Sequence, residues 1–360
     1  MSDSKELGVK ATNHAFRQFD QVQKDQKYQL AEGQGEEEFD TEFEIKSCDM
    51  QEFLAGAPNA DAAFAQELGS ALEEIGFAVL TGHGIDAEIV QQANDAIRKF
   101  FETIPESRRL EFLAARHGSV NQGYFPIKET TIIHPGLVEG WVFCRRAFDM
   151  DDRPEFEPEL FWPEPRYEPL FRQLCQTHEQ LILPLMQSLL RYLECDPHSY
   201  DQKLTATNFG FRMNYYPALT DDDLRSGAGR MLGHEDVDLF TFLPAHGLKG
   251  LQVLNRRNMK WIRLDPPRGS IVINTGDYMQ RITNDRLPST THRVSIPRDE
   301  RRRAQPRISF PMAVYVWENT LLEGLPELGP AKYPPISAIE FHTRTTSKYY
   351  GADYAVDGSP

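Results

Sequence analysis

Three side chains in the second half of the sequence have the types and spacing of metal ligands: His234 and Asp236 in Gly-His-Glu-Asp, and His292 in Thr-Thr-His-Arg-Val. Residues i and i+2 of a β-strand point to the same face, so a strand here would direct His234 and Asp236 to one ion. His292 would then arrive from another strand. Two imidazoles and one carboxylate suit iron(II) sites that keep positions open for oxygen and a co-substrate. The pattern therefore predicts an iron(II) site.

Further short motifs accompany these three residues in a characteristic order. Together with the expected ligands, they resemble the isopenicillin N synthase-like family of iron(II)/2-oxoglutarate-dependent oxygenases, over about residues 43 to 320. The motifs are Asn214-Tyr215-Tyr216-Pro217, Gly250-Leu251-Gln252-Val253, Asn274-Thr275-Gly276-Asp277 and Arg307-Ile308-Ser309.

Arg307 and Ser309 would share one face of a strand, because they are two residues apart. A planar guanidinium and a hydroxyl donor together suit one carboxylate. The resemblance implies that this pair binds the distal carboxylate of 2-oxoglutarate. It also implies that the phenol of Tyr216 assists and that Asn214 is its neighbour in the pocket.

The resemblance implies an enzyme that uses Fe(II), molecular oxygen and 2-oxoglutarate. It would oxidise a C–H bond of a small molecule, most simply by hydroxylation, and release succinate and carbon dioxide. One alternative is an iron(II) oxidase or cyclase of the same fold that does not use 2-oxoglutarate, in which the Arg–Ser pair serves another carboxylate. A second alternative is a catalytically idle binding protein that keeps the fold.

The remaining histidines lack partners at ligand spacing. We expect His83 to be a turn residue, because it lies in Thr81-Gly82-His83-Gly84. The others are expected to be surface or structural residues: His14, His117, His134, His178, His198, His246 and His342.

The composition excludes several classes of function. The chain has 360 residues, of which 40% are hydrophobic, so it can bury a sizeable core. Its formal net charge is −15, from 54 acidic and 39 basic residues. A nucleic-acid binder or membrane-surface binder would need a basic face, so neither partner is expected.

The cysteines and the N-terminus predict a cytoplasmic location. The four cysteines (Cys48, Cys144, Cys175 and Cys195) have no Cys-x-x-Cys spacing, so they indicate neither a disulfide framework nor a zinc site. The N-terminus lacks the apolar segment of a secretory signal. No apolar run approaches the ~20 residues that span a bilayer.

The pattern of apolar residues predicts a helical N-terminal region. Residues 61–75 and about 86–103 have apolar stripes at helical spacing, with a buried strand at 77–80 between them. A third helix is expected over about 167–193, with Pro184 kinking or splitting it.

The segment from residue 117 to 165 is expected to be irregular and to line the substrate pocket. Long segments on a rigid scaffold often carry binding residues. Aromatic walls with a few charges suit an anionic or amino-acid-like small molecule. Alternatively, the aromatic residues pack the segment onto the barrel. The expected substrate residues are Tyr124, Lys128, Trp141, Arg145 and Arg146.

From about residue 209, short β-rich runs separated by turn residues predict a jelly-roll. The expected fold is mainly β with flanking helices: a double-stranded β-helix (jelly-roll) core with an N-terminal helical region. The expected organisation is a polar extension at 1–42 that is disordered or forms a lid, a helical region at 43–205, an oxygenase core at 206–320, and a C-terminal tail at 321–360 with a helix near 339–348.

Overall fold

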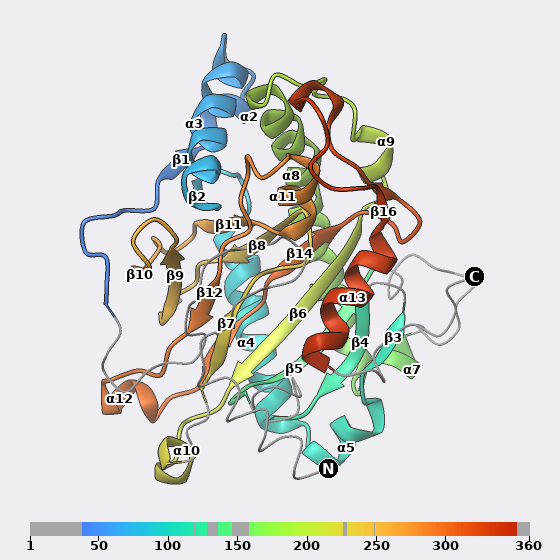
Figure 1. Ribbon diagram of the computed structural model, residues 1–360. Helices are drawn as coiled ribbons and strands as arrows, with labels where there is room; N and C mark the ends of the chain where they lie inside the picture. Colours follow the sequence, from blue (N-terminus) through green and yellow to red (C-terminus); the bar gives the residue numbers. More distant parts are fainter. Residues whose placement is uncertain are drawn as a thin grey trace.

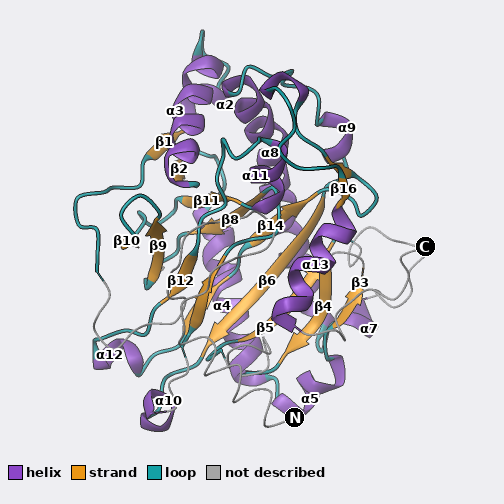
Figure 2. Ribbon diagram, in the orientation of Figure 1, coloured by secondary structure: helices purple, strands orange, loops and turns teal. Residues whose placement is uncertain are grey.

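A large, mainly antiparallel sheet crosses the molecule (Figures 1 and 2). The computed structural model describes residues 38–117, 120–127, 136–145, 158–225, 229–247 and 249–350. Within these ranges the large sheet has ten strands, and only β1 and β2 pair in parallel. In order across the sheet, the strands are β1 (Ser47–Asp49), β2 (Phe77–Thr81), β11 (Ile271–Thr275), β8 (Phe240–Pro244), β14 (Met312–Tyr315), β6 (Asn208–Tyr216), β5 (Glu139–Cys144), β4 (Val120–Phe125) and β3 (Ala115–His117), with β13 (Arg307–Ser309) also paired to β6.

A second sheet of four strands packs against one end of the large sheet. Val253 and Ile262 of the small sheet form an apolar cluster with Phe77 and Val272 of the large sheet. Two antiparallel sheets packed face to face are the jelly-roll arrangement, so the expected fold class is confirmed. The strands of the small sheet are β10 (Lys260–Leu264), β9 (Leu251–Asn255), β12 (His292–Val294) and β7 (Met231–His234).

Three long helices cover the outer face of the large sheet: α3 (Ala60–Ile75), α4 (Ala87–Thr103) and α8 (Glu168–Tyr192). Their apolar stripes enter one large core with the odd-numbered residues of β6. The α8 helix runs unbroken through Pro184, so the expected possibility of a split is wrong. The shorter helices are α2 (Gln51–Leu54), α5 (Glu106–Arg109), α7 (Pro158–Phe161), α9 (Asp201–Leu204), α10 (Asp221–Arg225), α11 (Asp277–Ile282) and α12 (Glu300–Arg303), with 3-10 turns at Leu110–Phe112, Pro165–Tyr167 and Pro326–Leu328.

The C-terminal helix α13 (Ala338–Tyr350) confirms the helix expected near 339–348, and in Figure 1 it is drawn alongside β6. A two-stranded sheet, β15 (Leu321–Leu322) and β16 (Ile336–Ser337), precedes it. No helix among the described residues combines the length and the apolar character needed to cross a membrane.

The expectation of an irregular segment over residues 117–165 is wrong for two of its parts. Residues 120–125 and 139–144 form β4 and β5, which extend the large sheet beyond β6. Every residue of β5 is buried. A strand buried on both faces lacks the apolar/polar alternation by which strands are recognised in a sequence.

The N-terminal extension was expected at 1–42, and residues 1–37 lie outside the described residues. Residues 38–40 run along the edge of β10, where Asp40 N–H donates to the carbonyl of Trp261. Because β1, β2, β4 and β5 all join the large sheet, that sheet crosses the expected boundary at residue 205. The division into four segments stays a prediction.

Gly69 sets how closely α3 approaches α8, because a Cβ atom at this position would lie 2.0 Å from Cγ of Tyr192. Valine has the better helix propensity by under about 1 kcal/mol, but overpacking a tight contact costs about 1–3 kcal/mol. We expect Gly69→Val to lower the free energy of unfolding by about 1–2 kcal/mol, measured by urea denaturation. Ala62→Val, at an exposed position of the same helix, should change it by under about 0.5 kcal/mol. Equal stability of Gly69→Val and the wild type would contradict the close packing.

Candidate metal centre and its pocket

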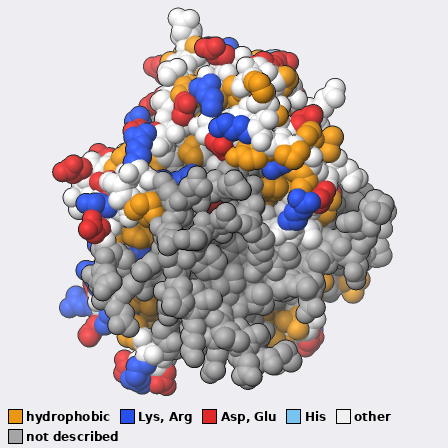
Figure 3. All heavy atoms as spheres, viewed as in Figure 1, with side chains coloured by type: hydrophobic (Ala, Val, Ile, Leu, Met, Phe, Trp, Pro, Cys, Tyr) orange, Lys and Arg blue, Asp and Glu red, His pale blue; other side chains and the backbone are white. Residues whose placement is uncertain are grey.

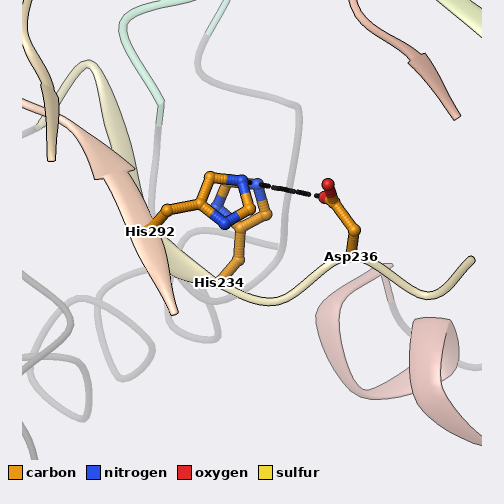
Figure 4. A group of neighbouring side chains, drawn as sticks. All are labelled: His234, Asp236 and His292. Carbon is orange, nitrogen blue, oxygen red and sulfur yellow. Dashed lines mark ion pairs between the residues drawn. The ribbon is translucent and has the colours of Figure 1, made fainter. Parts of the chain in front are cut away.

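His234 and His292 are direct partners across two antiparallel strands. His234 ends β7, His292 begins β12, and the register pairs the two residues. Side chains of directly opposed residues lie on the same face of a sheet. Their rings are accordingly 4.3 Å apart between centroids and tilted by 51° (Figure 4).

Asp236 completes the group from the loop after β7. The expectation that His234 and Asp236 share a strand is wrong, because β7 ends at His234. The Asp236 carbonyl instead accepts a hydrogen bond from Asp277 N–H at 2.8 Å, which holds the loop against α11. Oδ1 of Asp236 lies 3.7 Å from Nε2 of His234 and 3.8 Å from Nε2 of His292 (Figure 4). The three expected ligands therefore come together, but through a local structure that differs from the expected strand.

The second oxygen of Asp236 is held by two strands of the large sheet. Oδ2 accepts hydrogen bonds from Thr241 Oγ1 at 2.7 Å and from Asn274 Nδ2 at 2.8 Å. Burial alone would raise the pKa of Asp236. It is nevertheless lowered, because His292, His234 and these two hydrogen bonds stabilise the carboxylate. Asp236 is therefore an ionised carboxylate whose Oδ1 faces the two imidazoles.

Asp238 forms a second layer behind this carboxylate. Burial, followed by the charge of Asp236, raises the pKa of Asp238 well above its ordinary value. Oγ1 of Thr241 lies 2.6 Å from Oδ2 of Asp238 and 2.7 Å from Oδ2 of Asp236, but a hydroxyl has only one proton. A protonated Asp238 resolves this conflict by donating to Thr241, which then donates to Asp236.

The hydrogen bond of His292 determines which of its nitrogens can bind a metal. Nδ1 lies 3.1 Å from the carbonyl oxygen of Thr290, to which it can only donate. Nε2 is then the nitrogen with the free lone pair, and it is the one that faces Asp236. Phe77 packs edge-on against the imidazole at 5.3 Å between centroids, which restricts its rotation.

These donors fit one first-row metal ion. Nitrogen and carboxylate ligands bind such ions at about 2.1 Å, so two ligand atoms on one ion can lie at most about 4.2 Å apart. The distances of 3.7 and 3.8 Å from Oδ1 satisfy this limit. Two imidazoles and a carboxylate on one side of an ion leave its other side open, as in non-haem iron(II) oxygenases.

A second polar cluster lies where β6 pairs with β13. Nη1 of Arg307 donates to Oγ of Ser309 at 3.2 Å, and Nδ2 of Asn214 donates to the same oxygen at 3.4 Å. The guanidinium lies over the ring of Tyr216, 4.8 Å from its centroid, and Nε donates to the carbonyl of Lys249 at 2.9 Å. Because Ser309 Oγ accepts twice here, its own proton is available to an acceptor in the cavity.

One cavity of about 310 Å³ joins the two clusters. It lies between the two sheets, and α13 contributes His342 and Thr346 to its wall. This volume suits a small molecule. All seven residues expected at the metal and the co-substrate line it: His234, Asp236, His292, Arg307, Ser309, Tyr216 and Asn214.

The three expected substrate residues that the structure describes, Tyr124, Trp141 and Arg145, do not line this cavity. Tyr124 and Trp141 are buried in the core, where Tyr124 donates to Glu139 at 2.5 Å and Trp141 packs on Phe100. Arg145 pairs with Glu179. The expectation is wrong for these three, and the alternative that the aromatic residues pack the segment onto the barrel holds. Lys128 and Arg146 lie outside the described residues.

The prediction selected residues on the face of β4 and β5 that points away from the cavity. The strands β4 and β5 do border the cavity, but with Val120, Phe125 and Val142. The sequence analysis missed further polar residues of the wall, among them Arg212, Arg230 and His342. Arg212 is two residues before Asn214 on the same strand, so the i, i+2 rule could have found it. No sequence pattern indicates His342, because tertiary packing brings α13 to the cavity.

Comparison with known proteins agrees with this geometry. Residues 207–313 match the sequence model of the 2OG-Fe(II) oxygenase superfamily, and residues 45–165 match the N-terminal model of non-haem dioxygenases in morphine synthesis. A proline hydroxylase, buaE, of Petromyces alliaceus is 30% identical over 267 residues, covering 71% of this chain and 82% of that protein. The 2-oxoglutarate-dependent dioxygenase ucsF of an Acremonium species is 28% identical over 273 residues, covering 71% and 81%.

Solved structures agree as well. A protein from Caulobacter crescentus described as belonging to the 2OG-Fe(II) oxygenase family superposes with a TM-score of 0.71 at 27% identity, covering 84% of this chain and 98% of that chain. A full-length Neurospora crassa protein, solved in complex with alpha-KG and 5-formyluracil, superposes with a TM-score of 0.73 at 22% identity, covering 84% and 95%. At that identity, the second likeness concerns the fold alone.

The chain belongs to the 2OG-Fe(II) oxygenase superfamily. It is thus an iron(II)- and 2-oxoglutarate-dependent dioxygenase, as the sequence motifs implied.

Thr241→Val tests the support of Asp236, because valine keeps the shape of threonine and removes the hydroxyl donor. Loss of such a supporting hydrogen bond typically weakens metal binding about 10–100-fold. We expect a loss in this range, measured by anaerobic equilibrium dialysis of iron(II). Thr207→Val removes a buried hydroxyl that donates to the carbonyl of Leu204, away from the metal ligands, and should leave iron binding unchanged. Equal iron affinity of Thr241→Val and the wild type would refute the supporting role.

Proposed function

We propose that His234, Asp236 and His292 hold one iron(II) ion, and that the enzyme oxidises a C–H bond of a small molecule, most simply by hydroxylation. The observation that carries this proposal is the convergence of Oδ1 of Asp236 on both Nε2 atoms at 3.7 and 3.8 Å beside a cavity. With iron(II) and 2-oxoglutarate bound, the site would supply oxidation by molecular oxygen, with release of succinate and carbon dioxide.

We further propose that Arg307 and Ser309 bind the distal carboxylate of 2-oxoglutarate. Arg307 offers a planar fork, and Ser309 offers the hydroxyl proton that its two hydrogen-bond donors leave free. The ring of Tyr216 packs against the guanidinium of Arg307, and Asn214 positions Ser309. Neutralising this carboxylate in a cavity away from bulk water gives the co-substrate one orientation.

The proposed substrate is an anionic or amino-acid-like small molecule. A relative of the chain is named a proline hydroxylase, and the cavity has room for a molecule of that size. Neither nucleic acid nor a membrane is proposed as a partner. The chain has a net charge of −15, and acidic and basic side chains are interspersed on the described part of the face in Figure 3. A cytoplasmic location is also part of the proposal, since all four cysteines are buried and none of them forms a disulfide.

The test is a screen of amino acids and other small carboxylic acids with purified enzyme, iron(II), oxygen and 2-oxoglutarate. At least one compound should stimulate succinate formation with an equal amount of oxidised product, and His234→Ala should abolish both. Product without succinate would support the alternative oxidase or cyclase. If none of the compounds is oxidised or stimulates succinate formation, the proposed substrate class is contradicted.

Arg307→Ala tests the co-substrate site. Removing one partner of a desolvated charge pair costs about 2–5 kcal/mol, and each 1.4 kcal/mol corresponds to a factor of about ten. The apparent constant for 2-oxoglutarate should therefore rise about thirtyfold or more. Arg307→Lys should recover only part of the loss, because an ammonium cannot form two parallel hydrogen bonds. An unchanged constant in Arg307→Ala would rule out this assignment.

A further inference from the structure

Arg212 occupies the cavity face of β6. Gly210, Arg212, Asn214 and Tyr216 alternate along this face and all line the cavity, whereas the odd-numbered residues of the strand enter the core on the other side. Arg212 is thus the third cavity residue from the end of the strand at which Arg307 pairs with Tyr216.

Contacts within the sheet hold the guanidinium of Arg212 in place. Its Nε donates to Oδ1 of Asn214 at 2.6 Å, and its Cζ lies 5.2 Å from the ring centroid of Phe125. Gly140 on the neighbouring strand leaves space for this arrangement, since a Cβ there would lie 3.3 Å from Nε of Arg212. The plane of the guanidinium is therefore set before any ligand arrives.

The two terminal nitrogens of Arg212 have no hydrogen-bond partner among the described residues, nor does any described carboxylate lie within 4.0 Å of them. Two arginines elsewhere in the fold have acidic partners. Arg109 pairs with Glu139 and Arg145 pairs with Glu179. Arg212, like Arg307, instead faces the cavity without an acidic partner, so its positive charge is left for an anion in the cavity.

A polar ladder relates Arg212 to the co-substrate site. Asn214 accepts from Arg212 through Oδ1 and donates to Ser309 through Nδ2, and Ser309 accepts from Arg307. One 2-oxoglutarate molecule has two carboxylates. In the proposed function, Arg307 binds the distal one. The keto-acid end with the other would lie at the open side of the metal ion. Neither remains for Arg212.

We propose that Arg212 binds a carboxylate of the oxidised substrate through its Nη1 and Nη2 atoms. The apolar body of that substrate would lie against Val142, which pairs with Arg212 across the sheet, and against Val120 and Tyr315 beside Gly210. The substrate class is a small carboxylic acid with an aliphatic body, such as an amino acid. This inference rests on the proposed function, because it assigns 2-oxoglutarate to Arg307.

Binding measurements separate the two sites without requiring turnover. The protein, loaded with iron(II) and 2-oxoglutarate and kept anaerobic, is titrated by calorimetry with the proteinogenic amino acids, including L-proline, and with their carboxamides. We expect at least one amino acid to bind and its uncharged amide to bind at least about thirtyfold more weakly, as is typical when one partner of a desolvated charge pair is lost. Arg212→Gln should weaken the same amino acid by a similar factor, and Arg212→Lys by less.

Two further variants make the result specific. Arg263→Gln removes an arginine that also stacks on a phenylalanine, Phe39, but lies outside the cavity, so amino-acid binding should not change. Arg307→Gln should weaken 2-oxoglutarate rather than the amino acid. Absence of 2-oxoglutarate binding to the wild type would refute the proposed function. The role of Arg212 is refuted if no amino acid binds the wild type, if Arg212→Gln binds it equally well, or if the amide binds as tightly as the acid.

Discussion

The pairing of His234 with His292 across β7 and β12 is the contact on which the site depends. It fixes two proposed ligands on one face of the small sheet. The third comes from a loop but is held by the large sheet, through Thr241 on β8 and Asn274 on β11. The metal centre therefore joins the two layers of the jelly-roll. A shift of one sheet relative to the other would move Asp236 away from the histidines. The geometry of the site therefore depends on how the two sheets pack.

The alternation of side chains along β6 divides the molecule into a structural side and a chemical side. Its odd-numbered residues meet α3, α4 and α8 in an apolar core, and its even-numbered residues face the cavity. Because the backbone between them is hydrogen-bonded to β5, β13 and β14, the polar groups on the cavity face are held rigidly. Rigid placement of this kind allows two guanidinium groups in one cavity to serve different carboxylates.

The sequence predicted the grouping of the site residues better than the local structure that builds the site. The His–Asp–His group and the Arg307–Ser309 pair could be recognised because their residue types and order are specific to one chemistry. The strand assumed for Asp236 was incorrect, since a loop held by distant side chains satisfies the same spacing. The prediction of the substrate residues was wrong for a different reason. In strands buried on both faces, such as β5, hydrophobicity does not distinguish the face that borders a cavity. The aromatic side chain of Trp141 suggests a pocket wall, but Val142 is the residue that lines the cavity. The contribution of α13 is a tertiary contact that no local pattern encodes.

The most direct test of this account is a crystal structure of the protein grown without oxygen in the presence of iron(II) and 2-oxoglutarate. The account predicts one iron ion bound by Nε2 of His234, Oδ1 of Asp236 and Nε2 of His292, with the distal carboxylate of 2-oxoglutarate on Arg307 and Ser309. Iron bound by other residues, or the distal carboxylate of 2-oxoglutarate bound to Arg212, would contradict it.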